Sequence, residues 1–345
     1  MGARRAVVTA GTGGIGLGTA VGLARAGFAV TVVGRDAGRG AAAVERIDAE
    51  AQAAAAAREA AAAREAAAAR EAAAAREAAA AREAAAARAV GAAGAGAAAG
   101  VEVPGAPSAR FLRADLTSLA RVRELAGVLV DEGPLDVLVN NVGGFFVERR
   151  EFGGVEGAFV LNHLSPYLLT ELLLPALVAG APSRVVNVTS AAVALGGRRF
   201  DGVEPGGGYY GFHRYGRAKL ANLAYSLDLA KRLDGTGVAV LAADPGGAST
   251  DLSGRTMADP RIVHPALRAL WPVLGRVFAR STSGSAEAAA RSTVVAATDP
   301  GLAGRTGIVV GARGRVARPA RAATRPEVAA AVRALSERLV SEPRD

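Results

Sequence analysis

Short apolar runs alternate along the chain with longer stretches in which apolar residues recur at helical spacing. Seven of the short runs are rich in Val, Leu and Ile and predict β-strands: Ala6–Thr9, Ala29–Val33, Phe111–Ala114, Val137–Asn140, Val185–Thr189, Val238–Ala242 and Ile308–Val310. The stretches between them predict helices near residues 15–26, 37–50, 117–131, 155–179, 213–233, 285–297 and 326–340. Nearly continuous apolar strands separated by helices are typical of a parallel sheet covered on both faces. The pattern therefore predicts an α/β fold, a doubly wound, seven-stranded parallel sheet with helices on both faces, in one domain over residues 1–345.

One segment departs from this pattern. Residues 51–100 are nearly all Ala and Gly, and an Arg-Glu pair recurs every six residues from Arg58 to Glu83. Because Ala has the highest helix propensity, we expect a long helix that ends in the Gly-rich stretch at 91–100. A step of six residues turns about 240° around a helix, so the charges spread over three faces and leave no apolar stripe. We interpret residues 51–100 as a low-complexity helical insertion exposed to solvent, with a partner-binding arm as the alternative.

Composition excludes several classes of protein. The chain is 51% apolar and 21% charged, which fits a globular core and not a disordered chain. It has no Cys, and His163, His213 and His264 are too scattered to favour a structural zinc site, so we expect no metal. No apolar run reaches about 18 residues, and the N-terminus lacks the apolar stretch of a signal peptide. We therefore expect a cytoplasmic protein without a membrane span.

The net charge of +9 is concentrated toward the C-terminus, where residues 301–345 hold nine Arg against four acidic residues. These Arg are dispersed and form no recognisable nucleic-acid-binding module, so we expect no nucleic-acid partner. Only two of the 41 basic residues are lysines, Lys219 and Lys231. A lysine at a meaningful spacing is therefore informative in this chain.

A glycine-rich turn follows the first predicted strand and opens the first predicted helix, with the sequence Thr9-Ala10-Gly11-Thr12-Gly13-Gly14-Ile15-Gly16. Such a turn lets backbone amides at a helix N-terminus approach a pyrophosphate, where the helix dipole favours the anion. A bare G-x-G-x-x-G would arise by chance about 0.7 times in so Gly-rich a chain, so its position between strand and helix matters most. The cofactor-binding residues predicted here are Gly11, Thr12, Gly13, Gly14, Ile15 and Gly16; a plain tight turn is the alternative.

The end of the second predicted strand indicates which nucleotide is preferred. Gly34 offers no carboxylate for ribose hydroxyls, and Arg35 follows directly, where a guanidinium suits a 2′-phosphate. Asp36 weakens this interpretation, and a solvated Arg35 is the alternative. The residues favour NADP(H) over NAD(H), although NAD(H) also fits.

The spacing of Tyr215 and Lys219 points to chemistry. With five Tyr and two Lys in the chain, a chance Tyr-x-x-x-Lys is expected only about 0.03 times. Residues i and i+4 share one face of a helix, so the ammonium would lie beside the phenol and lower its pKa from about 10. Such a phenol can act as an acid and a base near neutral pH. The alternative is a half-buried Tyr beside a Lys that extends to solvent.

Together these motifs resemble the short-chain dehydrogenase/reductase superfamily, over the whole chain except the insertion. Val160–Leu164, Tyr215–Asn222 and the 25-residue gap from Ser190 to Tyr215 are most similar to the retinol-dehydrogenase-like branch. The resemblance implies a Rossmann-type fold. It also implies an NADP(H)-dependent oxidoreductase that interconverts a carbonyl and an alcohol by hydride transfer.

The resemblance also assigns roles to individual residues. Tyr215 would exchange a proton with the substrate oxygen, and Ser190 would hydrogen-bond that oxygen. Lys219 would lower the Tyr215 pKa and hold the nicotinamide ribose. Asn162 would order a water molecule. Besides Tyr215 and Lys219, the cofactor contacts implied in the same way are Asp115, Leu116, Asn141, Val142, Gly143, Pro245, Gly246 and Thr250.

Three residues depart from the family's pattern. Ala10 stands where the family has its first Gly, so its methyl group could strain the turn unless Gly11 takes that role by a shift of one residue. Val142 replaces a usual Ala, and Asp244 precedes Pro245 where Asn or His is commoner. These departures concern the binding of the cofactor and leave the proton chemistry in place.

The substrate side is expected between residues 247 and 283, where the family builds a lid. Apolar residues recur there at helical spacing: Leu267, Leu270, Trp271, Leu274, Val277 and Phe278. This face would pack on the core, line a substrate channel or touch a membrane surface weakly. Six residues beside the catalytic motifs suggest a bulky, apolar small-molecule substrate, namely Phe145, Phe146, Tyr209, Tyr210, Phe212 and His213. A homo-oligomer is compatible with the sequence, and a non-catalytic NADP(H)-binding sensor or scaffold is the alternative function.

Overall fold

The seven predicted strands all form and lie in one sheet. The computed structural model describes residues 3–87, of which 78–87 by their backbone alone, and residues 108–204, 206, 208–246, 259–264, 268 and 284–342. Within these residues the sheet has eight strands in the order β10-β9-β8-β7-β4-β1-β2-β3. Their bounds are β1 Arg5–Thr9, β2 Ala29–Gly34, β3 Arg110–Arg113, β4 Val137–Asn140, β7 Ser183–Val188, β8 Val238–Ala243, β9 Ile308–Val310 and β10 Val316–Ala317.

The parallel part of the sheet matches the prediction, and one edge strand was missed. Strands β1–β4 and β7–β9 pair in parallel, and the strand order reverses between β1 and β4. In doubly wound sheets the crevice at this switch point receives ligands at the carboxyl ends of the strands. The eighth strand, β10, pairs antiparallel to β9. It has only two residues, both exposed, which is too short for a periodic signal in the sequence.

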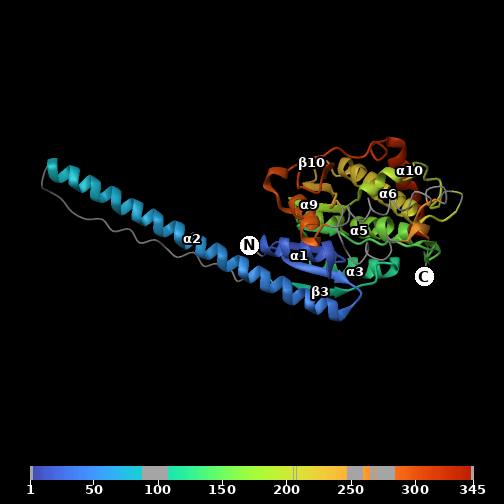
Figure 1. Cartoon of the computed structure of the whole chain (residues 1–345), viewed down its shortest axis with the longest axis horizontal. Helices are drawn as coiled ribbons and strands as arrows, with labels where there is room; N and C mark the ends of the chain where they lie inside the picture. The colour runs from blue at the N-terminus through green and yellow to red at the C-terminus, as the bar shows by residue number, and fades with distance from the viewer. Residues whose placement is uncertain are drawn as a thin grey trace.

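Helices cover both faces of the sheet (Figure 1). On one face, α1 (Gly14–Arg25) packs between α2 (Ala37–Ala87) and α9 (Ala286–Thr298). The other face carries α3 (Leu119–Asp131), α5 (Ser165–Ala179) and α6 (Gly211–Arg232), with α10 (Pro326–Ser341) packed on α6. Shorter elements complete the described chain: β5 Glu151–Phe152, β6 Val155–Glu156, α4 Gly157–Phe159, η1 Val160–Leu164, η2 Ala191–Leu195, η4 Pro260–Ile262 and η5 Pro300–Leu302.

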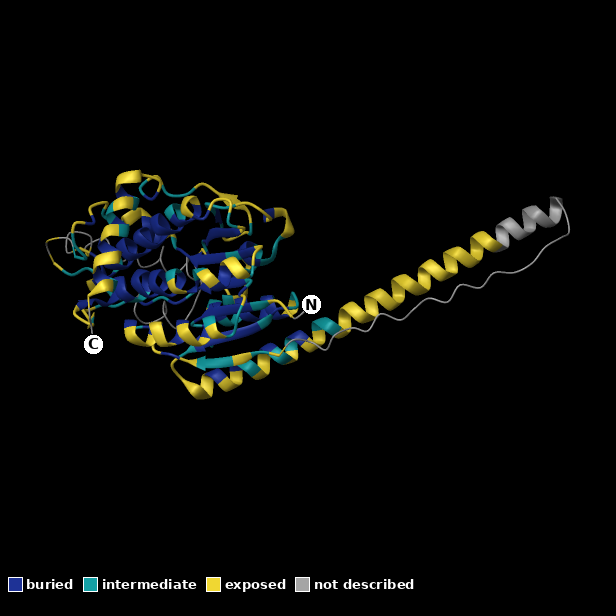
Figure 2. Ribbon diagram, turned by 180° about the vertical axis from the view of Figure 1, so that it is seen from behind, coloured by how far each residue is buried: buried dark blue, intermediate teal, exposed yellow. Residues whose placement is uncertain are grey.

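Helix α2 contains residues 51–87 of the Ala-rich insertion. The sequence predicted a helix near 37–50 followed by a helical insertion, and the structure joins the two in one helix of 51 residues, about 77 Å long. Ala43, Ile47 and Ala51 are buried against the sheet. From Gln52 to Glu77 the helix is almost wholly exposed and projects away from the body of the protein (Figure 2). The predicted helix end at 91–100 lies outside the described residues.

Much of the predicted lid also lies outside the described residues. Of residues 247–283, only 259–264 and 268 are described, so Thr250 and the apolar series from Leu267 to Phe278 are not among them. None of the described helices is both long enough and apolar enough to cross a lipid bilayer.

A buried histidine joins helix α10 to the core. The Nε2 atom of His163, in the π-helical turn η1, lies 2.7 Å from Oγ of Ser336 in α10. The imidazole is fully buried, and its ring centroid lies 5.0 Å from that of Phe159. Burial lowers the pKa of His163 to about 3, so the ring is neutral in the folded protein.

This burial predicts a loss of stability in acid. An unfolded His has a pKa near 6.5, so between about pH 6.5 and pH 3 the unfolded chain binds one proton more than the folded chain. This group alone should then lower the free energy of unfolding by up to about 1.4 kcal/mol for each unit of pH lost. Urea unfolding at pH 7.0, 6.0 and 5.0 measures the slope, with His163→Gln as the comparison. An equally steep slope in the variant would contradict the assignment.

Candidate active site

The glycine-rich turn links the end of β1 to the start of α1. Gly13 is the N-cap of α1, and no side chain caps this helix end. Its backbone N–H groups are therefore not satisfied by a protein side chain, as expected for a turn that receives phosphate oxygens. The described structure thus fits a dinucleotide at this turn.

Close packing explains why the turn needs glycine. A Cβ atom on Gly16 would lie 2.2 Å from the carbonyl oxygen of Ala10 and 2.5 Å from Nδ2 of Asn141. A Cβ atom on Gly11 would lie 2.7 Å from Cγ1 of Val32. Asn141, at the end of β4, donates from Nδ2 to the carbonyl oxygen of Thr9 at 3.1 Å and so ties the two strand ends together. Gly11, Gly16 and Asn141 are thus brought together where the sequence placed the cofactor.

Ala10 adopts a backbone conformation that suits glycine. Its φ is +51°, and it is the one non-glycine residue with positive φ in the described part of the chain. Gly11 does not have positive φ, so the alternative of a one-residue shift is wrong. The left-handed region costs a residue with a Cβ roughly 1–2 kcal/mol. The turn is therefore strained at the position where the sequence departs from its family.

The end of β2 carries two arginines beside the turn. Arg35 is exposed, as is Arg39 in the first turn of α2. The Nη2 atom of Arg39 lies 2.5 Å from the position that a Cβ on Gly13 would take, so this guanidinium lies over the glycine turn. Arg35 was predicted from the sequence, and Arg39 was missed. No periodic signal in the sequence singles out Arg39, because Arg35 precedes α2 and the two residues do not share a helix face.

Tyr215, Ser190 and Lys219 meet at the carboxyl end of β7. Ser190 follows β7 and precedes the 3-10 turn η2, and its side chain lies beside Tyr215 of α6, where it favours the phenolate. The Nζ atom of Lys219 lies 5.8 Å from the centroid of the Tyr215 ring and donates to the carbonyl oxygen of Val188 at 2.8 Å. Three of the four catalytic candidates from the sequence are thus in one cluster, together with the last residue of β7.

Burial dominates the pKa values of this cluster. It raises the pKa of Tyr215 to about 12, although the Ser190 side chain acts in the opposite direction. The carboxylate of Asp244 raises the pKa of Tyr215 further. Burial lowers the pKa of Lys219 to about 8. The net shift of the Tyr215 pKa is thus upward, opposite to the expected fall, because burial of the phenol outweighs the effects that favour the phenolate.

Asn162 lies next to Lys219, on the π-helical turn η1. Its Nδ2 donates to the carbonyl oxygens of Gly144 at 2.7 Å and Ala158 at 2.8 Å, and its Oδ1 accepts from the Gly144 amide at 3.2 Å. A Cβ atom on Gly143 would lie 2.8 Å from Oδ1 of Asn162 and 3.6 Å from Nζ of Lys219. Single π-turns are frequent at functional sites. Here the turn places Asn162 between the segment after β4 and the catalytic helix.

The remaining predicted contacts lie at the carboxyl ends of other strands. Asp115 and Leu116 follow β3, and Oδ1 of Asp115 accepts from the amide of Thr117 at 3.0 Å. Pro245 and Gly246 follow β8, and Gly246 has a φ of +68°. Val142 is buried beside the β4 end.

Apolar side chains form a wall beside the Tyr215 ring. The cluster consists of Phe145, Ala192, Tyr215, Ile262 and Val263, with Val147 and Phe212 packed against it. The Phe145 ring lies edge-on to Tyr215, with 5.8 Å between centroids. Ile262 and Val263, from η4 and the residue after it, were missed because their short segment has no periodic pattern.

The other predicted aromatic residues are placed differently. Tyr209 donates from its hydroxyl to Glu156 at 3.2 Å, and the rings of Phe146 and Phe152 pack edge-on. Tyr210 contacts His264. His213 is half-buried, and burial lowers its pKa.

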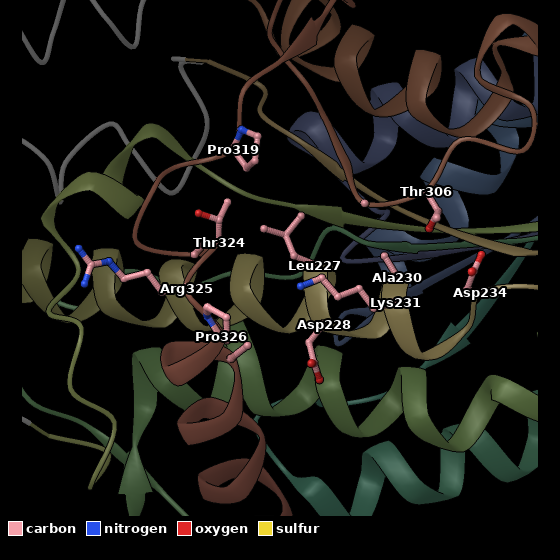
Figure 3. Close-up of a pocket in the computed structure, with 13 residues that line it drawn as sticks. Leu227, Asp228, Ala230, Lys231, Asp234, Thr306, Pro319, Thr324, Arg325 and Pro326 are labelled. Carbon is pink, nitrogen blue, oxygen red and sulfur yellow. The ribbon is translucent and has the colours of Figure 1, made fainter.

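Two described cavities lie away from this cluster. One, of about 460 Å³, is bordered by α6, by the start of β9 and by the residues that lead into α10 (Figure 3). Leu227, on its wall, is twelve residues beyond Tyr215 on α6, which is about 18 Å along the helix axis. The other, of about 340 Å³, lies at the amino ends of the strands, near Arg4 and Ser183. Neither contains a residue of the predicted site.

Comparison with known proteins decides the family. The family model described as short chain dehydrogenase matches residues 72–261, more than half of the chain. The chain belongs to the short-chain dehydrogenase family. The predicted family is therefore confirmed, and so is its retinol-dehydrogenase-like branch.

Similar relatives include retinol dehydrogenase 14 of Homo sapiens, which is 41% identical over 155 residues, or 44% of this dehydrogenase and 45% of the relative. Dehydrogenase/reductase SDR family member 13 of Homo sapiens is 41% identical over 172 residues, 48% of this chain and 44% of the relative. The chain thus spans about half the length of the curated relatives it matches.

Solved structures share the fold. The Pseudomonas aeruginosa RhlG/NADP active-site complex is 26% identical, with a TM-score of 0.56 over 90% of this dehydrogenase and 95% of that chain. A short-chain type dehydrogenase/reductase from Mycobacterium ulcerans is 19% identical, with a TM-score of 0.57 over 90% of this chain and 89% of that chain. At that identity, the second likeness shows the fold alone.

The strain at Ala10 predicts that Ala10→Gly stabilises the dehydrogenase. Relief of the left-handed strain gains roughly 1–2 kcal/mol, and the added freedom of the unfolded chain costs about 0.5–1 kcal/mol. We expect a net gain of about 0.5–1 kcal/mol in the free energy of unfolding, measured in urea. Gly14→Ala, at a φ of +52°, is the matched control and should destabilise. A loss of stability in Ala10→Gly would contradict the account of the turn.

Proposed function

We propose that this dehydrogenase is an NADP(H)-dependent oxidoreductase that interconverts a carbonyl and an alcohol on a bulky, apolar small molecule. The observation that carries the proposal is the cluster of Ser190, Tyr215 and Lys219 at the end of β7. The same edge of the sheet carries the glycine turn after β1, which fits a dinucleotide. When bound, the nicotinamide supplies or accepts the hydride.

Tyr215 is the residue proposed to move the proton. Because its pKa is raised to about 12, the phenol is protonated at neutral pH and is ready to donate to a carbonyl oxygen that gains negative charge. The Ser190 hydroxyl, in contact with the phenol, can donate a hydrogen bond to the same oxygen and lower the energy of that charge. The free protein is therefore set for reduction of the carbonyl.

Lys219 would stabilise the phenolate that remains after this transfer. Its pKa of about 8 keeps most of the ammonium charged at neutral pH. The cation lies 5.8 Å from the Tyr215 ring centroid in a buried site, where charges interact more strongly than in water. We propose that Lys219 also contacts the nicotinamide ribose and that Asn162 orders a water beside it.

The other proposed cofactor contacts come from the glycine turn and from the segments that follow the strands; of these, Thr250 lies outside the described residues. The residues proposed to contact the cofactor are Gly11, Thr12, Gly13, Gly14, Ile15, Gly16, Asp115, Leu116, Asn141, Val142, Gly143, Pro245, Gly246 and Thr250. Arg35, directly after β2, and Arg39, in the first turn of α2, favour a 2′-phosphate, which supports NADP(H). The apolar wall of Phe145, Ile262 and Val263 supports an apolar substrate. A single domain with the 51–100 insertion and the 247–283 lid, a cytoplasmic location and a homo-oligomer stay predictions from the sequence.

Tyr215→Phe should remove nearly all turnover and leave NADPH binding within about twofold of the original. The substitution keeps the ring packing on Phe145 but removes the proton donor, which contributes typically 10²–10⁴-fold to such reactions. NADPH oxidation with a panel of aldehydes and ketones measures turnover, and quenching of protein fluorescence measures binding. Turnover retained in Tyr215→Phe would refute the role. NADPH binding without turnover in the unaltered enzyme would favour a sensor or scaffold.

The preference for NADPH should depend on both arginines that follow β2. We expect Arg35→Ala and Arg39→Ala each to raise the KM for NADPH about tenfold, because each removes a charge-assisted contact to the 2′-phosphate. The KM for NADH should change by less than about twofold. Arg198→Ala, an exposed arginine in the segment after η2, is the matched control. Parallel increases for both cofactors would contradict a role in recognising the 2′-phosphate.

A further inference from the structure

A buried arginine on α6, the helix that carries Tyr215, contacts the segment that follows η2. Because η2 begins directly after Ser190, we call it the Ser190 turn. Arg217 lies on α6 between Tyr215 and Lys219, and its side chain is almost completely buried, with 2% of the residue surface exposed. It is two residues from Tyr215, which is about 200° around the helix. Its side chain therefore leaves the helix on the side away from the phenol.

The guanidinium binds four backbone carbonyl groups of one short segment, residues 197–203. Nε donates to Val203 at 2.9 Å, and Nη2 donates to Gly202 at 2.6 Å. Nη1 donates to Gly197 at 3.3 Å and also to Arg199. The guanidinium carbon lies 4.1 Å from the centroid of the buried Phe200 ring. One side chain thus fixes the course of seven residues.

Burial of a charged guanidinium costs desolvation free energy, which favourable contacts must offset. Burial and the neighbouring Arg214 lower the pKa of Arg217 only to about 10, so the group stays charged at neutral pH. Carbonyl dipoles and an aromatic face solvate it in place of water. A neutral residue would fill the same space at a lower desolvation cost.

The clamped segment continues directly from the Ser190 turn. η2 packs on α6 with the two backbones almost in contact, since a Cβ on Gly216 would lie 2.4 Å from the carbonyl oxygen of Ala192. A Cβ on Gly196 would lie 2.9 Å from the carbonyl oxygen of Gly216. The backbone of η2 is thus seated on α6 at the residue next to Tyr215. Arg217 fastens residues 197–203, so the Ser190 turn is anchored by β7 on one side and by the clamp on the other.

We propose that Arg217 is a positioning residue that keeps Ser190 beside Tyr215 by clamping residues 197–203 to α6, the helix that carries Tyr215. The effect on turnover rests on the proposed function, but the clamp itself does not. Loss of the clamp loosens η2, moves the Ser190 hydroxyl away from Tyr215 and so weakens its effect in favour of the phenolate. The glycine-rich turn lies on other elements, between β1 and α1, so we expect its structure to be unchanged when the clamp is lost.

Arg217→Lys tests the proposal, because lysine keeps the charge but cannot reach four carbonyl groups at once. Hydrogen–deuterium exchange is measured on the full chain with NADPH bound. We expect exchange to rise at least tenfold in residues 190–204 and to stay unchanged in α1. Arg199→Lys is the matched control, since the Arg199 side chain is exposed and only its carbonyl group takes part. Phe200→Leu, which removes the ring beside the guanidinium, should give a weaker increase in the same residues.

Kinetics supply the second measurement. In Arg217→Lys we expect kcat to fall at least tenfold, with the Kd for NADPH within twofold and the pH at which alcohol oxidation rises shifted upward. The proposal is overturned if exchange rises across the whole domain, if it does not reach residues 190–192, or if kcat is unchanged although the segment exchanges faster. Should the unaltered enzyme reduce no carbonyl compound, the proposed function fails, and the exchange measurement still decides whether the clamp holds the Ser190 turn.

Discussion

The bond between Lys219 and the end of β7 is the contact on which the rest of the site depends. β7 lies inside the sheet between β4 and β8, and its last residue, Val188, is paired with Ala243 of β8. The Lys219 ammonium donates to the carbonyl group of Val188 and holds the catalytic helix against the strand end. Tyr215, one helical turn earlier, is thereby brought to Ser190, which lies two residues beyond the same strand.

Several residues near this contact are held in states that they would avoid elsewhere. Lys219 and Arg217 are buried cations, Tyr215 is a buried phenol, and Ala10 has the backbone conformation of a glycine. Each costs stability, and each lies at or beside the proposed site. Proteins tolerate such costs where the surrounding structure fixes the geometry and where function requires it. Residues 52–77 of α2 have no comparable cost, since they are almost wholly exposed and belong to a regular helix.

The sequence predicted the parallel sheet and its covering helices because their apolar residues recur with clear periods. It also predicted the residues at the strand ends, since Tyr215 and Lys219 share a helix face and the glycine turn comes directly after a strand. The features that it missed depend on contacts between distant segments. The carbonyl groups that bind Arg217, the π-turn that carries Asn162 and the position of Arg39 over Gly13 leave no periodic signal. The direction of the Tyr215 pKa shift was wrong because burial cannot be read from the spacing of Tyr and Lys.

Transfer of deuterium tests the account most directly. The enzyme is supplied with NADPH that carries deuterium in both positions at C4, together with an apolar ketone that it consumes, and the alcohol is examined by mass spectrometry and NMR. We predict that each alcohol molecule carries one deuterium on its carbinol carbon. Its hydroxyl proton should come from the protein and the solvent. An alcohol without deuterium on that carbon, or NADPH consumption with no alcohol formed, would contradict it.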